Sequence, residues 1–220
     1  MLGSPIEKSF CTTREAAVLL GVSVGTVQLW VESGLLQAWK TSGGHRRVLR
    51  DSIDRLLRKG ASPVPLSPPT NTPAVASRPL NVLVVEDDAS LLRLYRAHIS
   101  HWPMAPELTC VDGAIAALLH VGQGCPDLLI TDLHMPGMDG FHMLRELRRS
   151  VIAQQARIVV VTGLDAIDIA KNGGLPADIE VLPKPVPFDR LLAIATDMVR
   201  PVVLPRPDGA TRSRHEGVSP

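Results

Sequence analysis

Short apolar runs alternate with amphipathic segments along residues 80–200. Each run is rich in Val, Ile and Leu, and the segment after it places apolar residues at helical spacing. The runs are NVLVV, PELTCV, DLLIT, RIVVVT and IEVL, at residues 81–85, 106–111, 127–131, 157–162 and 179–182. Because near-continuous apolar strands of this kind are buried on both faces, the pattern predicts an α/β domain with a doubly wound, five-stranded parallel sheet.

A different pattern occupies the first 60 residues, where two short helical segments are separated by a three-residue turn. Thr12 followed by Glu15 is a capping-box pattern, which predicts a helix from about Thr13 to Leu20. Gly21 can end this helix in the left-handed conformation, and Ser23 can cap a second helix with the sequence VGTVQLWVES. The pair predicts a helix-turn-helix, whose second helix is the candidate reader of a DNA major groove.

The second helix is expected to bury one face and to present the other to DNA. Val24, Val27 and Trp30 are predicted to face the core of the domain. The residues predicted to face DNA are Ser23, Gly25, Thr26 and Gln28, with Leu29 at the margin. A glutamine can bond both N6 and N7 of adenine, so Gln28 favours an A·T pair.

A basic hairpin is predicted after the two helices. Leu36 to Lys40 form its first strand, and the sequence TSGG forms its turn, because glycine adopts positive φ without strain. Two glycines keep this tip narrow, and the arginines beyond them can pair with phosphates or enter a minor groove. The residues predicted to contact DNA from this wing are Gly43, Gly44, His45, Arg46 and Arg47.

Six prolines and no aromatic residue fall within residues 61–79, which cannot bury a core and are predicted to form an extended linker. Charge changes across this segment: residues 1–60 carry nine Lys and Arg against five Asp and Glu, whereas residues 80–200 carry ten against fifteen. The predicted organisation is an N-terminal extension (1–9), a winged helix (10–60), the linker (61–79), the α/β domain (80–200) and a flexible tail (201–220).

Composition excludes several classes of protein. No run of 18 apolar residues is present, so no membrane span is expected. The first residues, MLGSPIEKSF, lack the basic and apolar regions of a secretory signal, which favours a cytoplasmic location. The three cysteines are isolated and have no C-x-x-C spacing, which argues against a disulfide framework or a cysteine-based zinc site.

Polar side chains follow four of the predicted strands of the α/β domain. The motif EDD, with Glu86 and Asp87, follows the first strand, and Asp132 ends the third. Since the carboxyl ends of parallel strands meet at one edge, these carboxylates should converge there. Oxygen ligands without soft partners suit Mg²⁺, which keeps several waters and accepts phosphate oxygens. Lys184 adds a fixed positive charge and Thr162 a hydroxyl donor, so the group predicts a cradle for a phosphoryl group.

Asp132 is the candidate nucleophile of this cradle, because it lies on the middle strand between the acidic pair and Lys184. Phosphoryl transfer through a loose transition state demands mainly positioning and neutralisation of charge, and Mg²⁺ with Lys184 would supply both.

Residues 80–199 strongly resemble a response-regulator receiver domain, a flavodoxin-like fold, through VLVVEDD, DLLITDLHMPGMDG, VVVTG and LPKP. The resemblance implies that Asp132 accepts a phosphoryl group from the phosphohistidine of a histidine kinase or phosphotransfer protein. It also implies that Asp87, Asp132 and the backbone carbonyl of His134 bind Mg²⁺, with Glu86 supporting the site.

The same resemblance implies a switch. Thr162 would bond the acyl phosphate and be pulled inward, which moves the loop after the fourth strand. Many receivers carry a partner aromatic residue three positions before the lysine, where this chain has Val181. The switch would then be damped, or transmitted through backbone shifts.

Residues 10–57 resemble the MerR/excisionase type of winged helix, through TTREAAVLLGVSVGTVQLWVESGLL and TSGGHRR. Many members carry a basic residue where this chain has Gln28. The long dimerising helix of the sensor branch is missing, because the linker prolines begin a few residues after Leu57. Any dimer is therefore expected to form through another surface.

Two hypotheses follow. In the first, the chain is a two-component response regulator that binds double-stranded DNA and regulates transcription, with phosphorylation of Asp132 changing homodimerisation across a flexible linker. In the second, it is a signalling adaptor or phosphate sink whose receiver binds a protein, with nonspecific DNA binding or none. No enzymatic activity is expected beyond the receiver's own phosphorylation and dephosphorylation, because His134 stands where a second catalytic aspartate would be needed.

Overall fold

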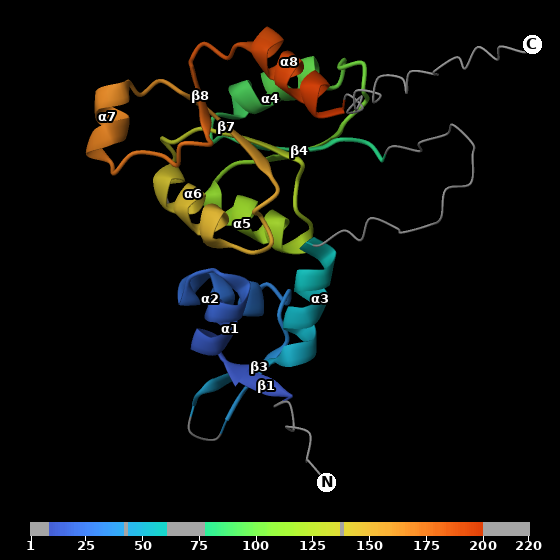
Figure 1. Ribbon diagram of the computed structural model, residues 1–220, viewed down its shortest axis with the longest axis vertical. Helices are drawn as coiled ribbons and strands as arrows, with labels where there is room; N and C mark the ends of the chain where they lie inside the picture. The colour runs from blue at the N-terminus through green and yellow to red at the C-terminus, as the bar shows by residue number, and fades with distance from the viewer. Residues whose placement is uncertain (1–8, 42–43, 61–77, 137–138, 200–220) are drawn as a thin grey trace, which may run out of the picture.

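The computed structural model describes residues 9–41, 44–60, 78–136 and 139–199. They form a small N-terminal domain and a larger α/β domain, stacked end to end along the long axis of the molecule (Figure 1). The predicted tail at 201–220, Gly43 of the wing, and almost all of the predicted extension at 1–9 and linker at 61–79 lie outside the described residues.

The N-terminal domain is a winged helix-turn-helix. Its three strands form an antiparallel sheet in the order β1-β3-β2. Its elements are β1 (Phe10–Thr12), α1 (Thr13–Leu20), α2 (Val24–Glu32), β2 (Ala38–Lys40), β3 (Arg46–Leu49) and α3 (Arg50–Gly60).

Local sequence signals set the ends of the first two helices. Both hydrogen bonds of the predicted capping box are present, because Thr12 Oγ1 accepts from the Glu15 N–H and Glu15 Oε2 accepts from the Thr12 N–H. Gly21 follows α1 with φ +67°, and the Ser23 side chain caps α2 by accepting from the Thr26 N–H. The sequence prediction missed β1, a three-residue strand that pairs with β3.

The second domain contains the predicted five-stranded parallel sheet, in the order β5-β4-β6-β7-β8. The strands are β4 (Asn81–Val85), β5 (Glu107–Val111), β6 (Leu128–Thr131), β7 (Arg157–Thr162) and β8 (Glu180–Pro183). The helices are α4 (Ala89–Ile99), α5 (Ala114–Gln123), α6 (Gly140–Arg149), α7 (Ala166–Lys171) and α8 (Phe188–Val199).

Helices cover both faces of this sheet, α5 and α6 on one and α4 and α8 on the other (Figure 1). Alternate strand residues divide between the two layers: Leu83 and Val85 join the core under α5 and α6, whereas Val82 and Val84 join the core under α4 and α8. Helix α4 ends at Ile99.

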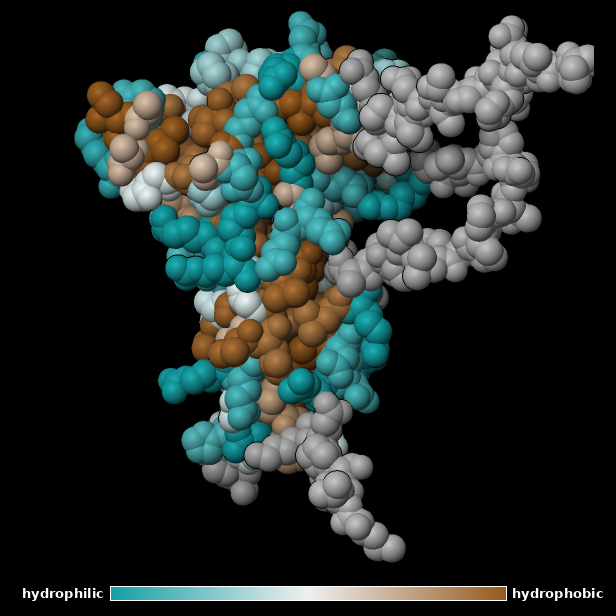
Figure 2. Space-filling model, viewed as in Figure 1, coloured by the Kyte–Doolittle hydropathy of each residue, from teal (hydrophilic) through white to brown (hydrophobic). Residues whose placement is uncertain are grey.

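The two domains pack against each other through α2, α5 and α6. One continuous hydrophobic cluster includes Val27 and Trp30 from α2 together with Leu118 and Val121 from α5. Figure 2 shows hydrophobic side chains gathered on the N-terminal domain where it meets the α/β domain. The sequence did not predict this contact, and the predicted flexible linker lies almost wholly outside the described residues.

Among the helices of the described residues, none alone is long and apolar enough to cross a membrane. Helices α1 and α2 would meet the length and composition criteria together, with a bend of 105° between them.

Candidate phosphoacceptor site and DNA-binding surface

Lys184 joins two carboxylates at the carboxyl edge of the parallel sheet. Its Nζ lies 2.7 Å from Asp132 Oδ2 and 2.8 Å from Glu86 Oε2. Glu86 follows β4, Asp132 follows β6 and Lys184 follows β8. The strand ends therefore bring together side chains that are up to 98 positions apart in sequence. The side chains of Glu86 and Asp132 are 2% and 7% exposed, which makes the Lys184 ammonium the nearby countercharge for both.

Burial and the shared ammonium act in opposite directions on the two carboxylates. Burial raises the pKa of Asp132, but hydrogen bonds from Lys184 and Thr162 lower it, and the net pKa lies below the ordinary value. Burial also raises the pKa of Glu86, and there the bond from Lys184 only partly opposes it, so the net pKa is raised. The fold therefore favours the ionised, nucleophilic form of Asp132 over that of Glu86.

Backbone groups hold the second oxygen of Asp132. Its Oδ1 accepts from the N–H groups of Leu133 and His134, the latter at 3.2 Å. Thr162, at the end of β7, is buried, and its hydroxyl accepts from the Leu164 N–H at 3.3 Å. The structure thus brings Glu86, Asp132, Thr162 and Lys184 to one place, as the sequence predicted.

Asp87 differs from these residues because its side chain is exposed. In the part of the chain that the structure describes, no three His, Cys, Asp or Glu side chains are close enough to hold a metal ion together. Mg²⁺ needs only one or two carboxylates and keeps several waters, so the donor set of Asp132, Asp87 and a backbone carbonyl still fits this ion.

Gly140 is a positioning residue that the sequence prediction missed. A Cβ atom at this position would lie 2.7 Å from the Asp132 carbonyl oxygen and 2.7 Å from the Leu133 Cα. Its N–H donates to the Leu133 carbonyl at 3.1 Å. Only glycine therefore lets the first turn of α6 pack against the backbone that carries Asp132. The sequence signal was the final glycine of MPGMDG.

Val181 and α7 line an exposed groove of about 490 Å³ beside the loop after β7. The Val181 side chain is 39% exposed. Val181 therefore lies at the surface, and its expected role in switching stays a prediction.

The wing lies at the end of the molecule away from the α/β domain (Figure 1). Gly44 has the positive φ (+79°) that the turn was predicted to require, and His45 beside it is exposed. Arg46 pairs with Glu32 of α2 at 3.0 Å, and Arg47 is half-buried. The described part of the wing is accessible to a partner.

Helix α2 corrects two expectations. Val24 is 37% exposed rather than buried in the core. Thr26 is 4% exposed, because it packs against the α/β domain rather than facing outward. Gly25 and Gln28 are exposed and Ser23 is half-buried. Gly21, just before α2, also permits the contact between the two domains. A Cβ atom at this position would lie 2.2 Å from the carbonyl oxygen of Arg149 on α6.

A family model described as the response regulator receiver domain matches residues 82–196, more than half of the chain. The chain therefore belongs to the response regulator receiver domain family. A second model, a helix-turn-helix domain, matches residues 10–61.

Curated relatives are similar over part of the chain. Response regulator MprA of Mycobacterium leprae (strain TN) is 30% identical over 135 residues, which cover 61% of this chain and 56% of that protein. Transcriptional regulatory protein MalR of Bacillus subtilis (strain 168) is 28% identical over 122 residues, covering 55% and 51%. The chain thus spans about half the length of these relatives.

The solved structures that resemble this chain cover a similar share of it. A sensor protein from Polaromonas sp. JS666 is 25% identical with a TM-score of 0.49, covering 56% of this chain and 96% of that one. The signal receiver domain of an HD domain-containing protein from Pseudomonas fluorescens Pf-5 is 28% identical with a TM-score of 0.46, covering 55% and 94%.

Proposed function

We propose that this protein is a two-component response regulator that is phosphorylated on Asp132 and binds double-stranded DNA through its winged helix to regulate transcription. The phosphoryl donor is a histidine kinase or a phosphotransfer protein. The observation that carries the proposal is Lys184 bonded to both Asp132 and Glu86 at the sheet edge of a chain that also contains a helix-turn-helix. The proposed functional units are residues 10–60 and 80–200.

The residues around Asp132 support in-line attack on a phosphohistidine. Asp132 is held ionised by Lys184, and its carboxylate oxygen forms the new bond to phosphorus while the bond from phosphorus to the histidine nitrogen breaks. The electron pair of the broken bond stays on the imidazole. Lys184 and the Thr162 hydroxyl then donate to the phosphoryl oxygens, which carry the negative charge.

Asp87, Asp132 and the His134 carbonyl are the proposed ligands of Mg²⁺, with Glu86 supporting them. When bound, the ion neutralises phosphoryl oxygen charge. We propose no catalysis beyond the chain's own phosphorylation and dephosphorylation, a cytoplasmic location, and dimerisation upon phosphorylation.

Phosphorylation is tested on the full chain with acetyl phosphate as a small donor. Incorporation should require Mg²⁺ and should map to Asp132. Duplex binding and mass by light scattering are then compared with and without beryllium fluoride, which mimics the acyl phosphate. A rise in both with the mimic supports the proposal. Incorporation at another residue, or none at any Mg²⁺ concentration, contradicts it.

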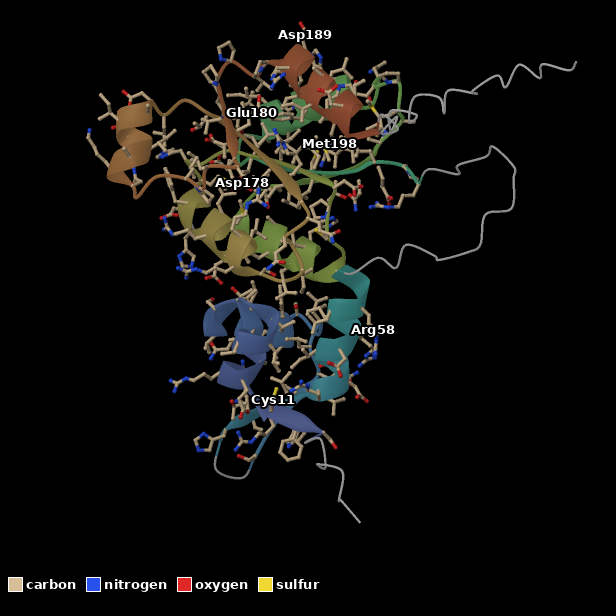
Figure 3. The ribbon with its side chains drawn as sticks, viewed as in Figure 1. Cys11, Arg58, Asp178, Glu180, Asp189 and Met198 are labelled. Carbon is tan, nitrogen blue, oxygen red and sulfur yellow. The ribbon has the colours of Figure 1, made fainter. Side chains whose placement is uncertain are left out.

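The wing is tested by Arg46→Ala. We expect weaker binding to all duplexes and a salt dependence reduced by about one counterion, because one phosphate contact is lost. Stability should change little, since the exposed pair with Glu32 contributes about 0–1 kcal/mol. Arg58→Ala on α3 is the matched control, because Arg58 is exposed and lies away from the wing (Figure 3). Equal losses for the two variants would contradict a DNA contact at the wing.

The adaptor hypothesis stays a second candidate because α2, VGTVQLWVE, contains no Lys or Arg. Binding that falls steeply with salt and prefers no duplex sequence would favour it.

A further inference from the structure

The N-terminal end of α2 is closed by a carboxylate from the receiver domain. Glu146 Oε2, on α6, accepts from the backbone N–H of Ser23 at 2.7 Å and from the hydroxyl of Thr26 at 3.0 Å. Glu146 and Thr26 are each 4% exposed. The two donors are residues that the sequence predicted to contact DNA, so the receiver occupies part of the proposed DNA-reading surface.

These donors are of the kind that hold phosphate. Backbone N–H groups and hydroxyls at a helix N-terminus bind anions, because unpaired donors and the positive end of the helix dipole meet there. DNA phosphates take the same groups when they fix the register of a recognition helix. A carboxylate and a phosphate are both anionic acceptors, and one pair of donors cannot serve both at full strength.

The negative charge of the buried Glu146 carboxylate is compensated by hydrogen bonds from the N-terminal end of α2. Within the described residues, no Lys, Arg or His side chain forms an ion pair with this carboxylate. A buried carboxylate without a cation is costly, and the hydrogen bonds from Ser23 and Thr26 offset that cost. The hydrogen bonds from both donors therefore stabilise the buried Glu146 carboxylate in the docked arrangement.

Two further hydrogen bonds join the same two domains, one from α2 and one to the end of α1. Trp30 Nε1, one turn after Thr26, donates to the Leu118 carbonyl of α5 at 3.0 Å. The Val151 N–H, after α6, donates to the Leu20 carbonyl at the end of α1 at 3.1 Å. The contact therefore runs along α2 from its cap to its last turn, while the wing stays at the far end of the molecule (Figure 1).

We propose that Glu146 is an intramolecular substitute for a DNA phosphate, which keeps α2 docked on the receiver and excludes DNA from its N-terminus. The closed form binds duplex DNA weakly, and release of Glu146 exposes Ser23 and Thr26 to a phosphate. This proposal rests on the proposed DNA-binding function, and one of its two readouts does not depend on DNA.

The test uses the full chain with Glu146→Ala, Glu146→Gln and Asp189→Ala. Alanine is a good helix former and removes both acceptor bonds without breaking α6, whereas glutamine keeps a weaker, neutral acceptor. Asp189 is the control, because it is an exposed carboxylate at the opposite end of the receiver (Figure 3). Hydrogen exchange of the α2 peptide reports docking, and affinity for a mixed pool of short duplexes at fixed salt reports DNA binding.

We expect faster exchange in α2 and affinity raised by about tenfold in Glu146→Ala, a smaller rise in Glu146→Gln, and neither in Asp189→Ala. Unchanged exchange in Glu146→Ala would overturn the docking role. Faster exchange with unchanged affinity, in a protein that does bind duplexes, would overturn the competition with DNA. If no form binds any duplex, the DNA-binding function and the exclusion of DNA both fail, and the exchange result alone still decides whether Glu146 holds the domains together.

Discussion

Asp132→Asn should abolish phosphoryl incorporation, reducing it to background in the presence of Mg²⁺ and acetyl phosphate. The substitution keeps the size of the side chain but removes the anionic oxygen that attacks phosphorus and that bonds Lys184 at 2.7 Å. Mass spectrometry of the intact chain measures the effect as the mass that a phosphoryl group adds. Basal DNA binding should remain, because the described part of the wing lies in the other domain.

Asp189→Asn is the matched control for that loss, since it removes an exposed carboxylate from the same domain. It should be phosphorylated like the unchanged protein. Retained incorporation in Asp132→Asn, or equal loss in both variants, would contradict the assignment of Asp132.

Asp132→Asn should also make the stability of the protein less sensitive to acid. The fold lowers the pKa of Asp132, mainly through Lys184 and Thr162 acting against burial. A lowered pKa contributes stability above the unfolded value of about 3.9, and that stability is lost as pH falls through the folded pKa. Asp132→Asn should therefore show a weaker loss of thermal stability on acidification than the unchanged protein, measured by melting from pH 6 down to about pH 3.

The receiver fold was predictable because its signals are local and repeated. Each buried strand is an apolar run, and Asp88 and Asp139 cap α4 and α6 through side-chain bonds to the helix backbone. The convergence of Glu86, Asp132 and Lys184 followed from topology alone, since parallel strands place their carboxyl ends at one edge. Strand β1 was missed because three residues are too few for a periodic pattern.

The contact between the domains was not predictable in the same way. Glu146 lies in the charged sequence LRELRR, where a glutamate is ordinarily exposed, and only the tertiary structure buries it. Thr26 was assigned to the DNA-facing side because its helix was considered without a neighbour. No local propensity identifies which surface of another domain will cover a helix.

Helix α6 connects the two sites described above. It begins at Gly140, which packs against the backbone of Asp132 and Leu133, and it carries Glu146 less than two turns later. Because the first turn of α6 packs closely against the backbone of Asp132 and Leu133, we expect a displacement of that backbone to reach the start of α6. The backbone of the phosphoacceptor and the carboxylate that closes α2 are therefore connected through helix α6.

Gly122→Leu should separate the domains while leaving the receiver folded. A Cβ at Gly122 of α5 would lie 3.0 Å from the Trp30 ring atoms Cε2 and Nε1, and 3.1 Å from Leu35 Cδ1, all three in the other domain. A leucine at this position extends well into the space that Trp30 occupies, so docking is blocked. Within α5 the change is favourable, because leucine exceeds glycine in helix propensity by nearly 1 kcal/mol.

Small-angle scattering and exchange together measure this separation in the full chain. The radius of gyration should increase and the α2 and α5 peptides should exchange faster, whereas the strands of the receiver should keep their protection. Gly124→Leu is the matched control, because a Cβ there meets nothing within 4 Å. If Gly122→Leu instead stays compact with unchanged exchange in α2, the prediction that it blocks docking is wrong. Trp30 must then repack around the new side chain, and the docked arrangement tolerates a larger residue than the contact held by Leu118 and Glu146 would allow.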